Sequence, residues 1–326
     1  NSGAVIFNGG DSTTQLFTGD TTFNDFTATT ADNSAGRTLR FTAGSTQTVA
    51  GTWTVTGYSG KVITIESSST SQWNINPTAA SVTYVSVSYS NNQGVEFCAT
   101  YSNDGGNNTN WDIGVADTCP ITISGTIYTD EGSTELDCTT SRTVNARVGG
   151  SGTDTAECSN SPSTGYYSIE VYAGSGDIVT LYLDDETEEG TTVYVSDGTE
   201  QTNVDIYQGW VIVRADTGSI TNANLATGDD GDNDVKYNVA TGNLTVEEDF
   251  NLHVWDSDIF APGGTVTTGN GGDLHINSNA TFNASGNDVT IGGSWRTEGF
   301  GIYTPGSNTT KFTSTSTGET LYFTSI

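Results

Sequence analysis

In the carboxyl-terminal third of the chain, the segment Asn251-Leu252-His253-Val254 returns 22 residues later as Asp273-Leu274-His275-Ile276. Both copies place a polar residue, a leucine, a histidine and a branched aliphatic residue in the same order. A repeat of about 20–25 residues is the length that one turn of a parallel β-helix needs. The repeat therefore predicts parallel strands in register, with the two histidines stacked on successive turns.

Short apolar segments of the same kind fill the first part of the chain. Val5-Ile6-Phe7 and similar segments alternate with small polar turns, and none carries the apolar stripe of a helix. Phe7 precedes Leu16-Phe17 by nine residues, and Phe312 precedes Leu321-Tyr322 by the same distance. This spacing makes the end of the chain resemble its beginning and favours the β-helix, although periodicity alone also allows a β-sandwich.

Residues 121–207 have a different pattern. Ile121-Thr122-Ile123-Ser124 opens a strict alternation of apolar and polar residues, and acidic turns separate the later segments. Such alternation is typical of antiparallel sheets with one buried face. We therefore predict an all-β chain in three parts: a parallel β-helix (β-solenoid) segment at 1–118, an inserted antiparallel β-sandwich at 119–208, and a second β-solenoid segment at 209–326.

The composition limits the partners and the compartment. Nine Lys+Arg against 39 Asp+Glu give a formal charge of −30, which argues against nucleic acid as a partner. No apolar stretch approaches the roughly 20 residues of a membrane span. The chain contains no Met and begins with Asn, so we expect a processed chain or a segment of a larger one. These features predict an extracellular or cell-surface protein.

The cysteines lie at positions 98, 119, 138 and 158. An even number of cysteines in an extracellular chain favours disulfides over free thiols. Three pairings are open from sequence, and we favour Cys98–Cys119 and Cys138–Cys158, each closing a loop rich in small polar residues. A zinc site is the alternative, although there is no C-x-x-C motif.

Some motifs resemble known families. Ser124-Gly125-Thr126-Ile127-Tyr128-Thr129-Asp130-Glu131-Gly132, followed by Gly165-Tyr166-Tyr167-Ser168-Ile169, resembles a carboxypeptidase regulatory-like (transthyretin-like) sandwich. The flanking Phe41-Thr42-Ala43-Gly44-Ser45-Thr46 and Ala261-Pro262-Gly263-Gly264-Thr265-Val266 resemble repetitive microbial surface proteins with parallel β-helix repeats. The resemblance implies adhesins, surface coats or fibre components, with no catalytic residues.

Acidic residues offer one candidate metal site. Asp230, Asp232 and Asp234 occupy alternate positions of one loop, and hard oxygen ligands of this kind suit Ca²⁺. The loop is not an EF-hand, and a hydrated acidic turn is the alternative. The histidines offer a second possibility: a structural ladder is the expected role of His253 and His275, and a metal pair completed by Asp256 or Asp273 is the alternative.

Catalytic motifs are absent from the sequence. There is no G-x-S-x-G, no H-E-x-x-H and no phosphate-binding glycine loop. A carboxylate pair that cleaves glycans is the enzymatic alternative, but none of the 39 acidic residues stands out as such a pair. Five N-glycosylation sequons occur, at Asn107, Asn243, Asn279, Asn283 and Asn308.

These observations predict a non-catalytic structural protein that forms a head-to-tail fibre or surface layer. The expected contact residues lie near the two ends of the sequence: Val5, Phe7, Leu16, Phe17, Phe312, Leu321, Tyr322 and Phe323. The partner would be another copy of the chain, since a contact between unlike surfaces that does not close gives a filament. The alternatives are an adhesin that binds a glycan or host surface through exposed aromatic residues such as Trp111, Tyr166 and Tyr167, and a carbohydrate-active β-helix enzyme.

Overall fold

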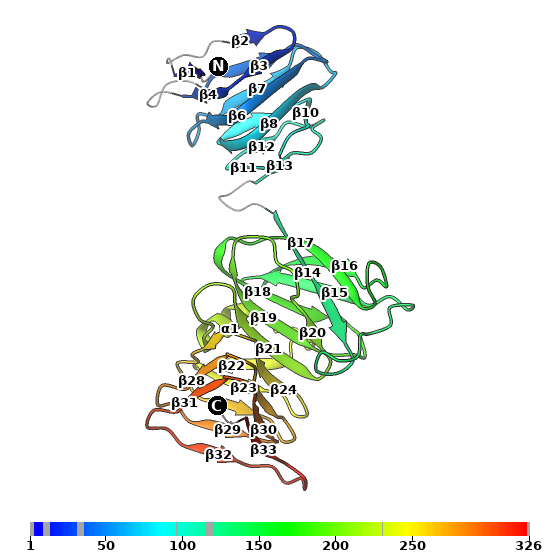
Figure 1. Cartoon of the computed structure of the whole chain (residues 1–326), viewed down its shortest axis with the longest axis vertical. Helices are drawn as coiled ribbons and strands as arrows, with labels where there is room; N and C mark the ends of the chain where they lie inside the picture. The colour runs from blue at the N-terminus through cyan, green and yellow to red at the C-terminus, as the bar shows by residue number, and fades with distance from the viewer. Residues whose placement is uncertain are drawn as a thin grey trace. The chain divides into compact units, whose positions relative to one another are not determined.

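The computed structural model describes residues 3–8, 14–30, 36–95, 97–114, 120–229 and 231–324. Over these residues the protein is all-β, as predicted, with 52% in strands and 2% helical. The chain divides into two compact units, Asn1–Pro120 and Ile121–Ile326 (Figure 1). No helix within the described ranges is long and apolar enough to cross a bilayer.

The first unit contains two sheets of parallel strands. One sheet has the order β1 (Ala4–Phe7), β4 (Asp25–Thr29), β6 (Thr46–Thr56), β8 (Trp73–Thr83), β11 (Cys98–Thr100) and β13 (Asp112–Ile113), with β3 (Thr21–Phe23) beside β6 and β10 (Ser90–Asn92) beside β8. The other has the order β12 (Asn103–Asp104), β9 (Val85–Val87), β7 (Ile63–Ser67), β5 (Thr38–Phe41) and β2 (Thr14–Phe17).

Alternation along these strands builds one core between the two sheets. In β4, Phe26 and Ala28 are buried while their neighbours are half-buried, as expected when successive side chains point to opposite faces. Phe26 pairs with Trp53 of the next strand, 27 residues along the chain. Phe41 stacks on Trp73 with ring centroids 3.8 Å apart. Large apolar side chains therefore line up from strand to strand through the first unit.

The second unit begins with two sheets that enclose a core of their own. One consists of β17 (Tyr166–Tyr172), β14 (Pro120–Tyr128) and β20 (Ile206–Tyr207). The other begins with β16 (Ser151–Glu157), β15 (Thr143–Val148), β18 (Ser175–Leu183) and β19 (Thr191–Asp197), joined by antiparallel pairs. Ile123 and Ile169 from the first sheet share the core with Val144 and Leu181 from the second.

One pairing in this region differs from the predicted antiparallel pattern. β20 runs parallel to β14, with Ile127 opposite Ile206. After β19 the chain crosses from one sheet to the other. It then forms β20, which runs in the same direction as β14. Sequence alternation does not report strand direction, because parallel and antiparallel strands both have a side-chain period of two.

In the rest of the second unit, the strands are distributed over three sheets. The sheet that begins with β16, which we call the long sheet, continues through β21 (Trp210–Ala215), β24 (Asn251–Val254), β27 (Leu274–Ile276), β30 (Trp295–Thr297) and β33 (Leu321–Phe323). A second sheet contains β22 (Tyr237–Ala240), β23 (Asn243–Val246), β26 (Val266–Thr268), β29 (Val289–Ile291) and β32 (Thr310–Phe312). The third contains β25 (Ile259–Phe260), β28 (Thr281–Asn283) and β31 (Ile302–Thr304).

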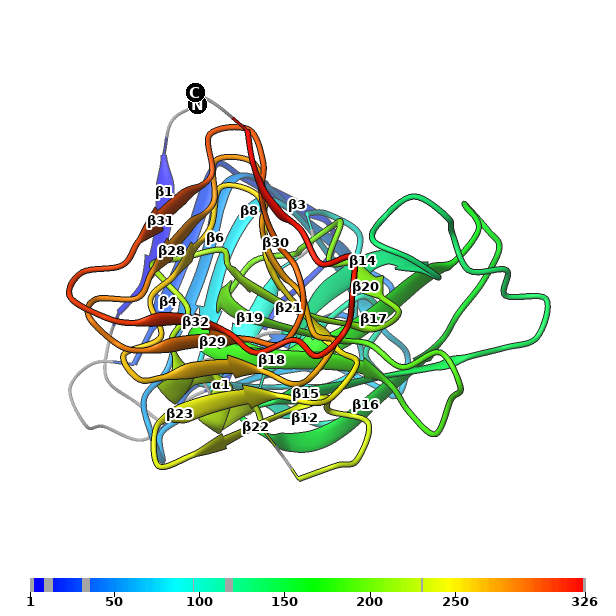
Figure 2. The ribbon, with the colours of Figure 1, turned by 90° about the horizontal axis from the view of Figure 1, so that it is seen from below.

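From β24 onward the chain enters these three sheets in a fixed order. Each circuit adds one parallel strand to every sheet, and Leu252 pairs with Leu274, which pairs with Trp295. Figure 2 shows the orange and red strands of successive circuits following the same outline. The pairing of the two Asn/Asp-Leu-His segments confirms the register that their 22-residue spacing predicted.

A short helix interrupts the strands after β21. α1 (Asn222–Gly228) starts at Thr221, whose hydroxyl accepts the backbone N–H of Asn224 in a capping box. Leu225 of this helix is buried in the same core as Val246 and Phe282. The helix is too short to show an apolar periodicity, so the sequence pattern gave no sign of it.

The long sheet runs across the predicted boundary at residues 208/209. β19 and β21 pair in parallel, with Val193 opposite Val213, so residues from both sides of that boundary belong to one sheet. The structure accordingly joins them in one compact unit, whereas the break near residue 118 lies close to the division at Pro120.

Candidate functional site

The two histidines of the chain lie next to each other on the long sheet. Parallel pairing of β24 with β27 places His253 opposite His275, and their ring centroids are 4.7 Å apart. The predicted stacking of the histidines on successive strands is thereby confirmed. Both side chains are almost completely buried, with exposed fractions of 2% and 4%.

A carboxylate from a distant loop reaches both imidazoles. Oε1 of Glu131 lies 3.0 Å from Nδ1 of His253 and also contacts Nδ1 of His275. Sequence analysis named Asp256 or Asp273 as the acidic partner, but the carboxylate that approaches the two rings is that of Glu131. We refer to Glu131, His253 and His275 as the His–Glu cluster.

The turn after β14 holds Glu131 in place. The carboxylate of Asp130 accepts the backbone N–H groups of Ser133 and Thr134 at 2.7 and 2.8 Å, which closes the turn around Glu131. Gly132 has a φ of +75°, and a Cβ at this position would lie 2.7 Å from the hydroxyl oxygen of Tyr207. Only glycine allows this backbone shape at such a close approach.

Arg296 joins the cluster from the next strand. It pairs with His275 in the register of β27 and β30, and its guanidinium contacts Oε2 of Glu131. The same nitrogen of Arg296 lies 3.0 Å from Nδ1 of His275. Glu131 is therefore surrounded by two imidazoles and one permanent positive charge.

The electrostatics favour an ionised Glu131 beside a neutral His253. Burial acts to raise the pKa of Glu131, but hydrogen bonds from His253 and His275 outweigh it, and the net shift is well below the usual range. Burial lowers the pKa of His253, and the hydrogen bond to Glu131 opposes this only in part. A neutral imidazole keeps one nitrogen lone pair, which a metal ion can use.

An open cleft adjoins the cluster. It has a volume of about 640 Å³ and is lined by residues that include Trp210, Asp273, Arg296 and Tyr322. The rings of Tyr207, Trp210 and Trp255 also surround His253, with centroids 5.7–5.8 Å away. The cleft therefore combines aromatic surface with carboxylates, the imidazole of His275 and a guanidinium.

The His–Glu cluster has the composition of a metal site. One nitrogen from each histidine and one oxygen of Glu131 lie within 4.8 Å of one another. Imidazole and carboxylate are common ligands of zinc and of the other late first-row metals. Sequence reasoning found the two histidines through the repeat but missed Glu131, which has no repeated counterpart, and Arg296, which takes the place of the histidine on the next strand.

The predicted calcium ligands lie elsewhere. Asp232 and Asp234 come together with Asp184, which follows β18, and we call these three residues the acidic cluster. Asp230, the third predicted ligand, lies outside the described residues. Asp184 was not predicted, although it belongs to an acidic turn, and its pKa is raised by burial and by the neighbouring carboxylates.

Protein groups already approach the carboxylates of the acidic cluster. Oδ2 of Asp232 accepts a hydrogen bond from the hydroxyl of Tyr182 at 3.2 Å and lies 3.4 Å from the guanidinium of Arg147. Oδ2 of Asp234 accepts the backbone N–H of Asp185 at 2.6 Å. Two of the predicted ligands are therefore close in space, but part of their negative charge is balanced by the protein.

The residues predicted to form end-to-end contacts are exposed or half-buried. Val5 and Leu16 are 38% and 60% exposed, whereas Phe7 and Phe17 are half-buried against the core of the first unit. In the second unit, Phe312, Leu321, Tyr322 and Phe323 are 43–57% exposed. All of them lie on β1, β2, β32 or β33, each at the edge of a sheet.

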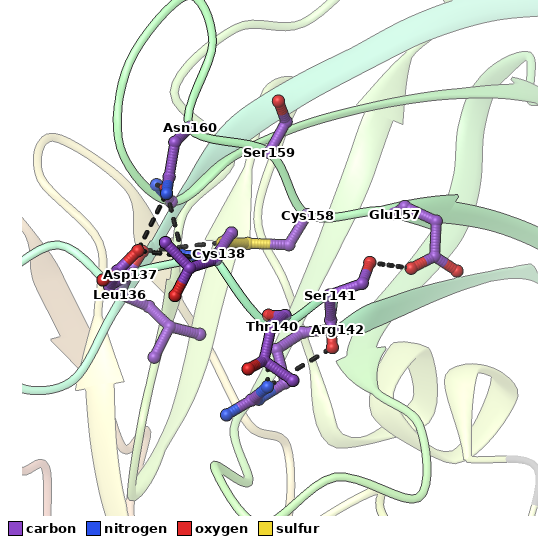
Figure 3. Close-up of a disulfide and its surroundings, with 12 residues drawn as sticks. Leu136, Asp137, Cys138, Thr140, Ser141, Arg142, Glu157, Cys158, Ser159 and Asn160 are labelled. Atoms are coloured by element: carbon purple, nitrogen blue, oxygen red, sulfur yellow. Dashed lines mark hydrogen bonds between the residues drawn. A yellow bond between two sulfur atoms is a disulfide. The ribbon is translucent and has the colours of Figure 1, made fainter.

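The predicted disulfides are seen in part. Cys138 and Cys158 are bonded, with their Cα atoms 5.8 Å apart (Figure 3). This bond links the segment after β14 to the end of β16. Cys119 lies outside the described residues, so the Cys98–Cys119 bond stays a prediction.

The five sequons fall into two groups. Asn107 and Asn279 are exposed in turns with φ near +60°. The side chains of Asn243, Asn283 and Asn308 are half-buried and take part in hydrogen bonds, such as that from Asn308 to the hydroxyl of Tyr303 at 3.0 Å. A glycan is accommodated more easily at the first group.

The aromatic residues proposed for glycan binding are less exposed than predicted. Tyr167 is fully buried, and its hydroxyl donates to the carbonyl of Val204. Trp111 packs against Trp53, and its indole N–H donates to Ser90 at 3.1 Å. Their description as exposed aromatics is therefore wrong for Tyr167 and only partly right for Trp111, since both side chains serve packing.

Comparison with known proteins adds no relative. No family model matches the chain, and searches of curated proteins and of solved structures find no match either. The resemblance to repetitive surface proteins and to a transthyretin-like sandwich stays a hypothesis.

Proposed function

We propose that this protein is a non-catalytic, extracellular structural subunit that assembles head to tail into a fibre or surface layer. In this proposal the parallel strands are two β-solenoid segments, 1–118 and 209–326, and residues 119–208 are an inserted sandwich. The disulfide and the high negative charge support an extracellular location.

The observation that carries the proposal is a loss of burial at the last strand of the long sheet. Five residues on successive strands of this sheet each pair with the next one: Val211, Leu252, Leu274, Trp295 and Leu321. Their exposed fractions are 0%, 0%, 1%, 3% and 57%. Leu321 continues an apolar column that is buried everywhere else, so a further strand laid on β33 would bury it in the same way.

Two other sheets, one in each unit, show the same change. Ile291 is fully buried, whereas its partner Phe312 in β32 is 43% exposed. In the first unit, Phe26 is 1% exposed and its partner Val5 in β1 is 38% exposed. Exposed edge strands with apolar side chains are templates for pairing with another chain.

A second copy of the chain is the proposed partner because its own edge strands β1 and β2 also pair in parallel within their sheets and expose apolar side chains. The contact would join unlike surfaces, so it can repeat into an open filament. Each subunit carries a formal charge of −30, and repulsion between subunits opposes the contact. Salt screens this repulsion, and we expect assembly to increase with ionic strength.

The test is a pair of charged substitutions on β33. Leu321→Asp with Phe323→Asp places two carboxylates in the proposed contact, and we expect monomers where the unmodified chain forms filaments. Tyr172→Asp is the control, because Tyr172 is 52% exposed on β17, a strand that takes no part in the proposed contact. Static light scattering and negative-stain microscopy at low and high salt measure the assembly.

Two results would contradict the proposal. One is assembly of the double variant at the wild-type rate and spacing, which would exclude β33 as the contact. The other is a wild-type chain that stays monomeric at high concentration and high salt, which would exclude head-to-tail assembly itself.

A further inference from the structure

We propose that the His–Glu cluster binds one divalent metal ion of the zinc class, through Oε1 of Glu131 and Nδ1 of both His253 and His275. The three atoms lie within 4.8 Å of one another, and both imidazoles are buried. Borderline ions such as Zn²⁺ and Co²⁺ prefer this mixture of nitrogen and oxygen ligands. The proposal is independent of fibre assembly.

The hydrogen bonds around His253 assign its proton. The side-chain oxygen of Asn277 accepts the backbone N–H of Ser278 at 2.7 Å, so the amide nitrogen of Asn277 is the atom that faces His253. This nitrogen lies 3.3 Å from Nε2 of His253 and can only donate. Nε2 therefore accepts, and the proton of the neutral ring is on Nδ1, where it donates to Glu131.

The surroundings of His275 cannot be satisfied in the same way. Its Nδ1 contacts Oε1 of Glu131, which needs a proton from the ring, and lies 3.0 Å from the guanidinium of Arg296, which can only donate. With the proton on Nδ1, two donors face each other. Without it, two lone pairs face each other. Either protonation state leaves one unfavourable contact.

A cation resolves this conflict. Bound between Oε1 of Glu131 and the Nδ1 atoms of the two histidines, it accepts one lone pair from each; at His253 the ring proton moves from Nδ1 to Nε2, so the amide group of Asn277 must turn away from that ring. Nε2 of His275 is buried without a hydrogen-bond partner, and a proton on that atom points toward Glu298, whose Oε2 is 3.6 Å away. A carboxylate behind a metal-bound histidine orients the ring and increases its basicity.

The protein leaves space for further ligands. A second cleft beside the cluster is lined by Asp130, Ser133, Tyr207 and Asn277 as well as by the proposed ligands. Three protein ligands with an open position are a common arrangement for zinc, with water in the remaining place. The ion would also fix the loop that carries Glu131 to strands β24 and β27.

Arg296 is the group that competes with the ion. It shares the Glu131 carboxylate, and a guanidinium this close to a metal ion weakens metal binding by charge repulsion. Its side chain is 39% exposed, so it can turn toward solvent when the ion binds. Removal of this charge should therefore tighten metal binding, which distinguishes a metal site from an ordinary ion-pair network.

The experiment measures metal binding to the full chain without an affinity tag, after chelator treatment. Calorimetry with ZnCl₂ gives stoichiometry and affinity, and the visible spectrum of added Co²⁺ reports nitrogen ligation. The chain has only two histidines, so any nitrogen-ligated cobalt signal can be assigned. We expect one ion per chain, with a dissociation constant in the micromolar range or below.

Variants then test each residue. Glu131→Gln, His253→Gln and His275→Gln should each weaken binding by more than about 100-fold, since loss of an outer partner alone costs about 10- to 100-fold. Arg296→Gln should tighten it by roughly 3- to 10-fold. Glu135→Gln is the matched control, because Glu135 is exposed on the same loop and should bind as wild type.

The outcomes separate cleanly. Circular dichroism without metal identifies any histidine variant that fails to fold. If the histidine variants do not fold, the test rests on Glu131→Gln and Arg296→Gln, because both of these side chains are partly exposed. Absence of zinc binding and of a cobalt spectrum at millimolar metal would overturn the proposal. Undiminished binding in Glu131→Gln would overturn it as well, and weaker binding in Arg296→Gln would show that Arg296 supports the site instead of competing for it, contrary to the proposal.

Discussion

Asp258 is a partly buried carboxyl group whose environment predicts a stability change with a definite dependence on pH. Burial is the largest influence and raises its pKa from the ordinary 3.8 to about 6. The backbone N–H of Ala215 and the guanidinium of Arg214 act in the opposite direction, while Asp216 and Asp256 add to the increase. The folded chain therefore holds this proton more tightly than the unfolded chain.

The magnitude follows from the shift. Stability is lost as the pH rises from about 3.8 to about 6, because over this range the unfolded chain ionises Asp258 while the folded chain still holds the proton. A shift of this size corresponds to about 3 kcal/mol, and solvent access to the side chain reduces the expected effect to about 1–2 kcal/mol. Asp258→Asn removes the ionisation and keeps an oxygen that can accept the N–H of Ala215, now 3.1 Å away.

Thermal melting between pH 4 and pH 8 measures the effect. For a unit of roughly 200 residues, we expect Asp258→Asn to raise the melting temperature by about 2–8 °C at pH 8 and to change it little at pH 4. Glu248→Gln is the control, because Glu248 is an exposed acidic residue of the same unit and is not one of the charges that shift the pKa of Asp258. A difference between Asp258→Asn and wild type that does not vary with pH, or a lower melting temperature at pH 8, would refute the reasoning.

Three further predictions concern charge, a covalent link and calcium. Arg142 donates hydrogen bonds of 2.7 and 2.8 Å to Glu188 and lowers the pKa of that carboxyl from 4.5 to about 2. Glu188→Gln should cost about 1 kcal/mol at pH 7, and its difference from wild type should shrink as the pH falls from about 4.5 to 2; urea unfolding at several pH values checks this. Replacing Cys138 and Cys158 by Ala opens a link with a sequence separation of 20 and should cost about 3 kcal/mol, and an unchanged urea midpoint would contradict it. For the acidic cluster we predict a higher melting temperature in calcium than in EDTA, lost in Asp232→Asn; identical curves in both buffers would remove calcium as a ligand.

The sequence predicted the strands best where side chains repeat. The spacing of the two Asn/Asp-Leu-His segments correctly predicted the pairing of Leu252 with Leu274 and of His253 with His275. Alternation also contained a signal that we misread, since Tyr167 has the same phase as Ile169 and Val171, and all three are buried. Its phase, not its aromatic character, decides which face Tyr167 occupies.

The remaining features depend on contacts between distant segments. Glu131 lies 122 residues from His253 in sequence, on a turn without a repeated counterpart, so no local pattern links the two. Asp184 joins Asp232 and Asp234 for the same reason: neighbouring strands and loops bring their ends together. Residue type and spacing identified two of the three residues in each cluster, whereas the third residue is set by which loops the sheets place side by side.

The fixed order in which the chain visits its three sheets from β24 onward has a consequence for how such a gene can change in length. A duplication in frame of one circuit, such as residues 252–273, would insert three strands that find equivalent neighbours above and below. The protein would lengthen by about 4.8 Å, and its lateral surfaces would keep their pattern. Loss of a single codon within a strand would instead turn every following side chain of that strand to the opposite face. Whole-circuit duplication is therefore the mildest mutation open to this part of the molecule, and a one-residue deletion is among the most damaging.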